Sequence, residues 1–325
     1  MTGTMIYNIL YALLGIAGLY YGAEFLIKGG VAIARKIGVS SLVIGLTLVA
    51  CATSAPELVV SVRSALQGNA DISLGNVVGS NTCNIALILG ISAMISPLAV
   101  QRQLLKLDIP VMIGAALLLT LFYFYRHGLS RIQGIILLLG FIAYTAWNIY
   151  ASGKELKQSA AAQAEKEEKE EKQPSMGFLP ALLFVIAGLG LLVGGAELFL
   201  ISAKFFAKVL KISDAVVGLT LVAVGTSLPE LATSVVAACK KEADIAIGNV
   251  VGSNIFNILG ILGIAPIISP MRNAQLDYVD LGTMLFCSVL LLPLMRTSWK
   301  ITRKEGALLL GIYCAYITYL CIAHT

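Results

Sequence analysis

Residues 45–58 read GLTLVACATSAPEL, and residues 218–231 read GLTLVAVGTSLPEL. Both stretches belong to a longer repeat, because residues 39–97 align without a gap onto residues 212–270, with 35 of 59 positions identical. Every aligned pair is separated by 173 residues. Each copy carries one glutamate in an apolar stretch, directly after a proline, a residue that breaks helices. This doubled pattern predicts a cation site at an interface between two halves of the chain.

The composition is that of a membrane protein: 58% of the residues are apolar, 13% are charged, and the mean hydropathy is +0.87. About 20 apolar residues make one spanning helix. The apolar stretches are too long for strands, and lipid admits only helices or closed barrels. We therefore expect an all-α membrane protein with ten transmembrane helices. The expected segments are 5–27, 40–62, 73–95, 107–125, 132–150, 177–201, 213–238, 246–268, 277–295 and 305–323.

Charge and cysteine usage narrow the functional classes. We interpret the net charge of +5 as loop charge that orients a membrane protein, not as a surface for nucleic acid. The six cysteines fall in or at the ends of apolar segments without ligand spacing, so we expect small buried residues. His127 and His324 lie in a loop and at the C-terminus, which argues against zinc or copper. We expect no enzyme, no cofactor and no obligatory protein partner.

One charged segment divides the chain. Residues 152–176 include six glutamates and five lysines between positions 154 and 172, which predicts a solvated linker. The expected domains are a first five-helix repeat over 1–151, a cytoplasmic charged linker over 152–176, and a second five-helix repeat over 177–325. Because five is odd, the second repeat enters the membrane inverted.

The distribution of basic residues predicts the orientation. With both termini outside, the inside loops hold 16 basic residues and the outside loops hold seven. The positive-inside rule therefore places both termini outside and the linker in the cytoplasm. Inverted repeats with broken helices are common among secondary transporters, whose sites lie near the bilayer midplane.

The first motif supplies acids and neutral oxygens together. Pro56 and Pro229 interrupt their helices and free nearby backbone carbonyls. An ionisable residue near the bilayer centre costs about 2.5–3.5 kcal/mol, so we expect a divalent cation, several monovalent cations or protons to neutralise the two acids. Calcium takes six to eight oxygen ligands. The predicted ligands here are the carboxylates of Glu57 and Glu230, the hydroxyls of Thr53, Ser54, Thr226 and Ser227, and the carbonyls of Ala50 and Ala223.

The second motif reads GNVVGSNTCN over 75–84 and GNVVGSNIFN over 248–257. Its glycines allow close helix approach. For Ser80, Asn84, Ser253 and Asn257 two interpretations are open: hydrogen bonds between helices, or completion of an oxygen cage. We interpret the other asparagines of the motif as structural, namely Asn76, Asn81, Asn249 and Asn254.

Four further acids lie near predicted helix ends. Asp71 and Asp244 begin the third and eighth segments, where they favour the helix dipole; a role at the mouth of the site is the alternative. Glu24 and Glu197 lie near the ends of segments one and six, where we expect capping or an interfacial position.

Together, G-T-S-x-P-E and G-N-x-x-G-S-N-x-x-N in two inverted copies resemble the sodium/calcium exchanger family of the cation/calcium antiporter superfamily, of prokaryotic type, over nearly the whole chain. The resemblance implies an antiporter that binds sodium and calcium competitively at the twelve residues named above. It also implies alternating access by sliding of segments one and six. Cys51 and Ala52 depart from the family pattern, so the halves are expected to bend unequally. Asn257 stands where potassium-dependent relatives carry Asp, which argues against potassium coupling and slightly against proton coupling.

Sodium/calcium antiport in the plasma (inner) membrane is therefore the expected function, with sodium ions, calcium ions and the lipid bilayer as partners. A proton/calcium antiporter or an antiporter of another divalent cation is the alternative within transport. A cation channel and a non-transporting membrane protein are alternatives of other classes.

Overall fold

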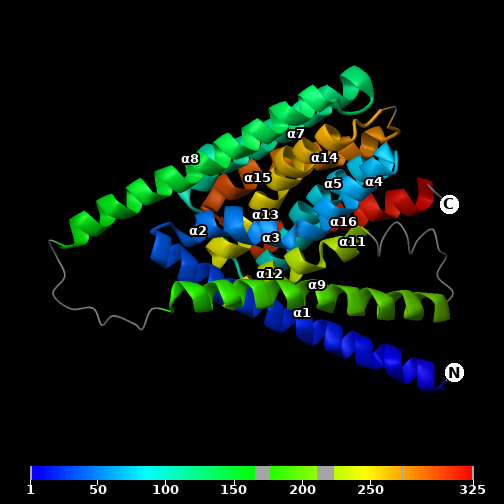
Figure 1. Cartoon of the computed structure of the whole chain (residues 1–325), viewed down its shortest axis with the longest axis horizontal. Helices are drawn as coiled ribbons and strands as arrows, with labels where there is room; N and C mark the ends of the chain where they lie inside the picture. The colour runs from blue at the N-terminus through cyan, green and yellow to red at the C-terminus, as the bar shows by residue number, and fades with distance from the viewer. Residues whose placement is uncertain (1, 165–175, 211–222, 273, 324–325) are drawn as a thin grey trace.

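The computed structural model describes residues 2–164, 176–210, 223–272 and 274–323, and they form a bundle of helices (Figure 1). Regular α-helices alternate with short π-helical segments, labelled η. The first half contains α1 (Thr2–Ile37), α2 (Ser41–Ile44), η1 (Gly45–Val49), α3 (Ala50–Thr53), α4 (Ala55–Leu66), α5 (Ala70–Thr82), η2 (Cys83–Leu89), α6 (Gly90–Ile95), β1 (Leu98–Ala99), η3 (Leu104–Asp108), α7 (Ile109–Arg126) and α8 (Arg131–Ala164). The second half contains α9 (Phe178–Val209), α11 (Ala223–Thr226), α12 (Leu228–Cys239), α13 (Ala243–Ile255), η5 (Phe256–Ile261), α14 (Leu262–Ile268), α15 (Tyr278–Ser298), β2 (Lys300–Ile301) and α16 (Arg303–Ala323).

The described residues contain eight helices that are long and apolar enough to cross a membrane. A ninth span is a bent pair, Ser41–Thr53 followed by Ala55–Leu66. The predicted segment 213–238 lies partly outside the described residues, which resume at Ala223 and contain the shorter apolar helix α12. The all-α membrane fold is confirmed, and the count of ten helices stays a prediction.

Two long helices, α1 and α9, pack side by side along one flank of the bundle (Figure 1). Glycines make this approach possible. A Cβ added at Gly22 would lie 2.7 Å from the backbone nitrogen of Leu192, and one added at Gly188 would lie 2.6 Å from that of Leu26. Both helices extend beyond the segments expected for them, 5–27 and 177–201. Small residues therefore hold α1 and α9 together as a close pair.

The second motif of each repeat lies in the centre of the bundle. Among the eight spans, residues 243–268 and 70–95 are the most buried, with 83% and 72% of their apolar windows inside the protein. The corresponding value for α1 and for α9 is 28%. The helix α13 packs against η1 and α3 of the other repeat. The two repeats therefore share one core.

Equivalent contacts recur at opposite ends of the bundle. In the two-stranded sheet, β1 pairs with β2, and Leu98 lies opposite Ile301. An isolated bridge pairs Leu129 with Met271. Met271 follows Leu98 by 173 residues and Ile301 follows Leu129 by 172, so the same contact occurs twice with the repeats exchanged. This exchange is expected of repeats that are related by a two-fold axis.

The predicted linker begins as a helix. Residues 152–164 continue α8 beyond the expected segment 132–150. At this end of α8, Ser152 Oγ accepts a hydrogen bond from the backbone nitrogen of Ser40 at 2.9 Å. Residues 165–175 of the linker lie outside the described residues.

Candidate cation site

A break in each repeat places a glutamate in the first turn of a helix. The bent pair Ser41–Thr53 and Ala55–Leu66 turns by 48°, and Ser54 separates the end of α3 from α4 with φ −82° and ψ 11°. Ser227 separates α11 from α12 with nearly the same angles, φ −88° and ψ 7°. The proline of each motif lies in the first turn of the second helix, where its missing N–H costs no helical hydrogen bond. Glu57 and Glu230 follow, at helix N-termini that favour negative charge.

The two glutamates meet in the core and are bridged across the repeats. Both have an exposed fraction of 0%. Ser227 Oγ donates to Glu57 Oε1 at 3.1 Å, and Ser54 Oγ donates to Glu230 Oε1 at 2.7 Å. Each carboxylate therefore receives a hydroxyl from the opposite copy of the motif. The sequence predicted two acids at an interface, and the structure brings them and both serines together.

Five buried side-chain oxygen atoms of the two repeated motifs have no hydrogen-bond partner in the part of the chain that the structure describes. They are Oε2 of Glu57, Oε2 of Glu230, Oδ1 of Asn84, Oδ1 of Asn257 and Oγ of Ser80. Leaving a buried acceptor unpaired costs about 1–3 kcal/mol, more if it is charged. Oxygens of this kind are the ligands that hard cations take. The arrangement therefore suits a cation better than it suits a closed protein core.

Asn84 and Asn257 form the inter-helix hydrogen bonds that were one interpretation of the sequence, and their part in an oxygen cage stays a prediction. Asn84 Nδ2 donates to Asn254 Oδ1 at 3.1 Å, and Asn257 Nδ2 donates to Asn81 Oδ1 at 3.0 Å. Each amide nitrogen thus links the repeats, while each amide oxygen has no partner among the described residues. Both asparagines lie in π-helical segments, η2 and η5, and such segments occur frequently at functional sites.

A second layer of asparagines holds the glutamate-bearing helices. The bonds run from Asn76 Nδ2 to Glu57 O (3.2 Å) and Ser61 Oγ (2.9 Å), and from Asn249 Nδ2 to Glu230 O (3.3 Å) and Ser234 Oγ (3.0 Å). These residues are equivalent in the two repeats. The structural role expected for Asn76 and Asn249 agrees with these contacts. Ser61 and Ser234 were not singled out from the sequence, and their equivalence across the repeats was the signal that could have found them.

The carbonyl of Ala50 is engaged by the protein itself. It accepts a bond from the backbone nitrogen of Ser54 at 3.0 Å and from the hydroxyls of Thr53 and Ser253 at 3.3 and 3.5 Å. In this conformation the Ala50 carbonyl is therefore not free, because the helix break lies at Ser54 and not at Pro56, and its role as a cation ligand stays a prediction.

Three further predicted ligands, Thr53, Thr226 and Ala223, lie in the short helices that precede the helix breaks. Thr53 Oγ1 lies 3.1 Å from Asn249 Oδ1 and 3.3 Å from the Ala50 carbonyl, and these two acceptors share its single hydroxyl proton. In the second repeat, Thr226 is half-buried at the end of α11, directly before the helix break. Ala223 is the first residue of α11, next to residues 211–222, which are outside the described part of the chain.

The acids near helix ends lie outside this cluster. Asp71 Oδ1 accepts the backbone N–H of Gln275 at 2.6 Å, and Asp244 Oδ2 accepts from Gln101 Nε2 at 2.7 Å. Each therefore anchors a loop. Across the described ranges, no three His, Cys, Asp or Glu side chains come close enough together to hold a metal ion. The central cluster thus combines two carboxylates with neutral oxygens.

One buried acid was missed. Asp108 has an exposed fraction of 0%, Tyr144 OH donates to its Oδ1 at 2.9 Å, and its Oδ2 has no partner within the described ranges. Asp108 lies at the edge of the expected segment 107–125, where an acid is expected to lie at the membrane interface. It belongs to a separate polar cluster with Tyr144 and Asn148, not to the two glutamates.

The comparison with protein families decides the relationship. The family model described as sodium/calcium exchanger protein matches residues 7–150 and 180–322. This chain belongs to that family. It is a multi-pass membrane protein, and the resemblance drawn from its motifs is confirmed. The sodium/calcium exchanger MaX1 of Methanosarcina acetivorans is 36% identical to it, with 96% of this chain and 98% of that one aligned.

Further relatives span the same length. The inner membrane protein YrbG of Escherichia coli is 32% identical, with 95% of each chain covered. A solved structure of the sodium-calcium exchanger NCX_Mj superposes with a TM-score of 0.81 at 37% identity, covering 97% of this chain and 99% of that one. The sodium/potassium/calcium exchanger 5 of Homo sapiens aligns with only 34% of this chain, at 34% identity.

Proposed function

We propose that this protein is a secondary active antiporter that exchanges sodium for calcium across a membrane. The observation that carries the proposal is the set of five unpartnered buried oxygens, drawn from both repeats and including two carboxylates. Family membership and the names of the full-length relatives, MaX1 and NCX_Mj, support the identity of the two ions.

The mechanism follows from competition for the same oxygens. Two carboxylates balance the charge of one calcium ion, or of sodium ions that replace it. A charged site without cations is costly inside the membrane, so the loaded states cross and the empty charged state does not. The proposed ligand set is Glu57, Glu230, Thr53, Ser54, Thr226, Ser227, Ala50, Ala223, Ser80, Asn84, Ser253 and Asn257.

We place the protein in the plasma membrane. Both of its termini then lie outside the cell, and the 152–176 linker lies in the cytoplasm. The ratio of 16 to seven basic residues supports this orientation. The contacts at the two ends agree with the predicted grouping of the loops, since Gln101 bonds to Asp244 at one end and Gln275 bonds to Asp71 at the other. The first residues of α1 and the last of α16 lie at the same end of the bundle (Figure 1).

The decisive experiment is calcium uptake into proteoliposomes loaded in turn with sodium, potassium or choline, followed by a pH step without sodium. Uptake that requires an outward sodium gradient supports the proposal. Uptake driven by the pH step alone would identify proton/calcium exchange at the same site. Calcium flux that needs no counter-ion and does not saturate would identify a channel.

The site assignment is tested by Glu57→Gln and Glu230→Gln. Each change keeps the size of the side chain and an oxygen for the serine of the opposite repeat, but it removes one of two charges. We expect both variants to lose sodium-driven calcium uptake. Glu197→Gln is the matched control, since Glu197 is exposed on α9. Near-normal uptake by either test variant would refute the assignment.

A further inference from the structure

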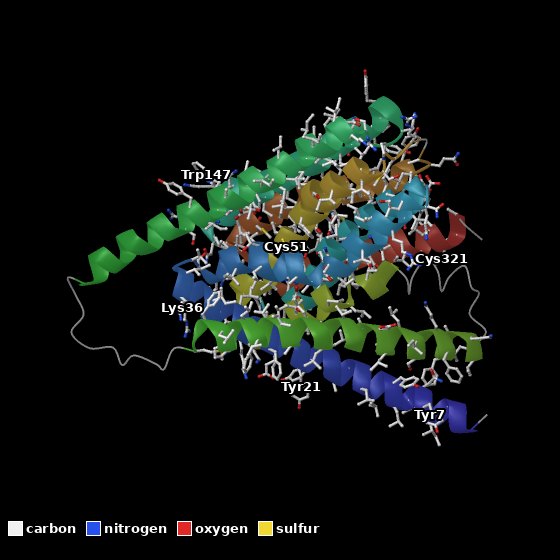
Figure 2. The ribbon with its side chains drawn as sticks, in the orientation of Figure 1. Tyr7, Tyr21, Lys36, Cys51, Trp147 and Cys321 are labelled. Carbon is white, nitrogen blue, oxygen red and sulfur yellow. The ribbon has the colours of Figure 1, made fainter. Side chains whose placement is uncertain are left out.

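A groove with a basic rim lies where α1 and α12 end and α9 begins. Its volume is about 690 Å³. The basic side chains that line it are Lys28, Arg35, Lys36 and Lys240, and the apolar ones include Ile27 and Val31. Figure 2 shows Lys36 at the end of α1, next to the first turn of α9. No part of the cation site described above contributes to this groove.

The charge of the groove is unbalanced. Among the described residues, its lining has one acid, Glu242, against four basic side chains. Glu24, on the preceding turn of α1, accepts ion pairs from both Lys28 Nζ at 2.9 Å and Lys240 Nζ at 2.8 Å through the same oxygen. A single carboxylate thus serves two ammonium groups, and an excess of positive charge is left for an external anion.

Arg35 and Lys36 extend the basic rim along α1. They follow Lys28 by seven and eight residues, about 10–12 Å along an α-helix, so Arg35 returns to nearly the same face and Lys36 lies about 80° further round. Both are exposed, and within the described part of the chain neither forms an ion pair. The two are therefore free to bind a group that approaches from outside the protein.

The position of the groove selects the class of anion. The end of α1 and the start of α9 both lie at the end of the bundle that the charge distribution assigns to the cytoplasm, where anionic lipids are concentrated. The apolar wall of α1 continues from the basic rim towards the bilayer centre. A ligand that fits both parts has an anionic headgroup and a hydrocarbon chain. The chain's own linker is a weaker candidate, because its six glutamates are offset by five lysines.

We propose that this groove binds an anionic phospholipid, with the phosphate among Lys28, Arg35, Lys36 and Lys240 and an acyl chain along Val31. The bound phosphate links α1 to the end of α12, the helix that carries Glu230 in its first turn. The lipid would therefore bridge the flanking pair of helices to the core.

The test is a titration of the purified full-length protein in neutral detergent with phosphatidylglycerol or phosphatidylcholine, followed by native mass spectrometry. We expect tighter binding of phosphatidylglycerol. A basic residue near an anionic surface contributes about fivefold in binding, so Arg35→Gln with Lys36→Gln should weaken phosphatidylglycerol binding about 25-fold. The matched control is Lys106→Gln with Lys304→Gln, two exposed basic residues of the same predicted membrane face that lie outside the groove. Size-exclusion elution verifies that both variants remain folded.

A gain-of-binding variant tests the same inference in the opposite direction. Glu24→Gln removes the carboxylate that Lys28 and Lys240 share, so it should tighten phosphatidylglycerol binding several-fold. Three results would overturn the proposal: equal binding of both lipids, equal weakening by the control variant, or weaker binding by Glu24→Gln. Displacement of the lipid by an equal concentration of glycerol phosphate would also overturn it, because an acyl chain would then contribute nothing.

Discussion

The close approach of α1 and α9 predicts which Gly→Ala substitutions in α9 destabilise the protein. Gly188 and Gly190 are two residues apart on α9, but they face different surroundings. A Cβ at position 188 would lie 2.6 Å from Leu26 N and 2.8 Å from Gly22 O, whereas one at position 190 would have no described atom within 4 Å. We predict that Gly188→Ala destabilises the protein and that Gly190→Ala does not.

The magnitude follows from the displacement that the methyl group requires. Ordinary contact begins at 3.4 Å, so α1 and α9 must part by roughly 0.8 Å, which is 3.4 minus 2.6. A gap of 0.5–1 Å forfeits about a quarter to a half of the dispersion energy of each contact that opens. Overpacking of this kind typically costs about 1–3 kcal/mol. Both variants share the gain in helix propensity of up to about 1 kcal/mol, which cancels when they are compared.

The assay is thermal unfolding in detergent, followed by the fluorescence of Trp147 and Trp299. A difference of about 2 kcal/mol corresponds to a difference in Tm of about 3 °C between Gly188→Ala and Gly190→Ala, because the entropy of unfolding scales with chain length. Gly22→Ala should match Gly188→Ala, and the double variant should cost less than the sum, because helices that have already parted accommodate the second methyl group. Equal Tm values for Gly188→Ala and Gly190→Ala would refute the reasoning.

Two further predictions concern buried hydrogen bonds. Asn249→Ala removes hydrogen bonds to Glu230 O, Ser234 Oγ and Thr53 Oγ1, each worth about 0.6 kcal/mol between membrane helices. We therefore expect the free energy of unfolding to fall by about 2 kcal/mol and sodium-driven calcium uptake to be impaired. A variant with wild-type Tm and wild-type uptake would contradict the role of this side chain. Tyr123→Phe removes a hydroxyl that donates to Ala274 O at 3.0 Å and accepts from Leu276 N at 2.9 Å. We therefore expect faster amide hydrogen exchange in residues 274–276, with calcium uptake retained. Unchanged exchange in these residues would argue against the role of Tyr123 in holding this loop.

Some contacts of the site could be predicted from the sequence pattern, and others could not. The repeat predicted that Glu57 and Glu230 meet, and an ionisable residue in an apolar segment needs a partner in any fold. The double use of Asn84, whose nitrogen binds Asn254 while its oxygen stays unpaired, could not be predicted, because it depends on which helix faces it. The ion pair of Glu24 with Lys240 was equally hidden, since the two residues are 216 positions apart and Glu24 lies outside the aligned repeat.

The sequence by itself determined the membrane location, the doubled architecture and the identity of the two acids. Hydropathy fixes the environment of a segment, and a repeat fixes which residues are equivalent, so neither property needs coordinates. Only the tertiary structure decided that Ser54 and Ser227 reach the carboxylates of the opposite repeat, that Ala50 is held by three donors, and that Asp108 is buried elsewhere. Those contacts depend on the distance and angle between helices from different parts of the chain, which local pattern does not encode.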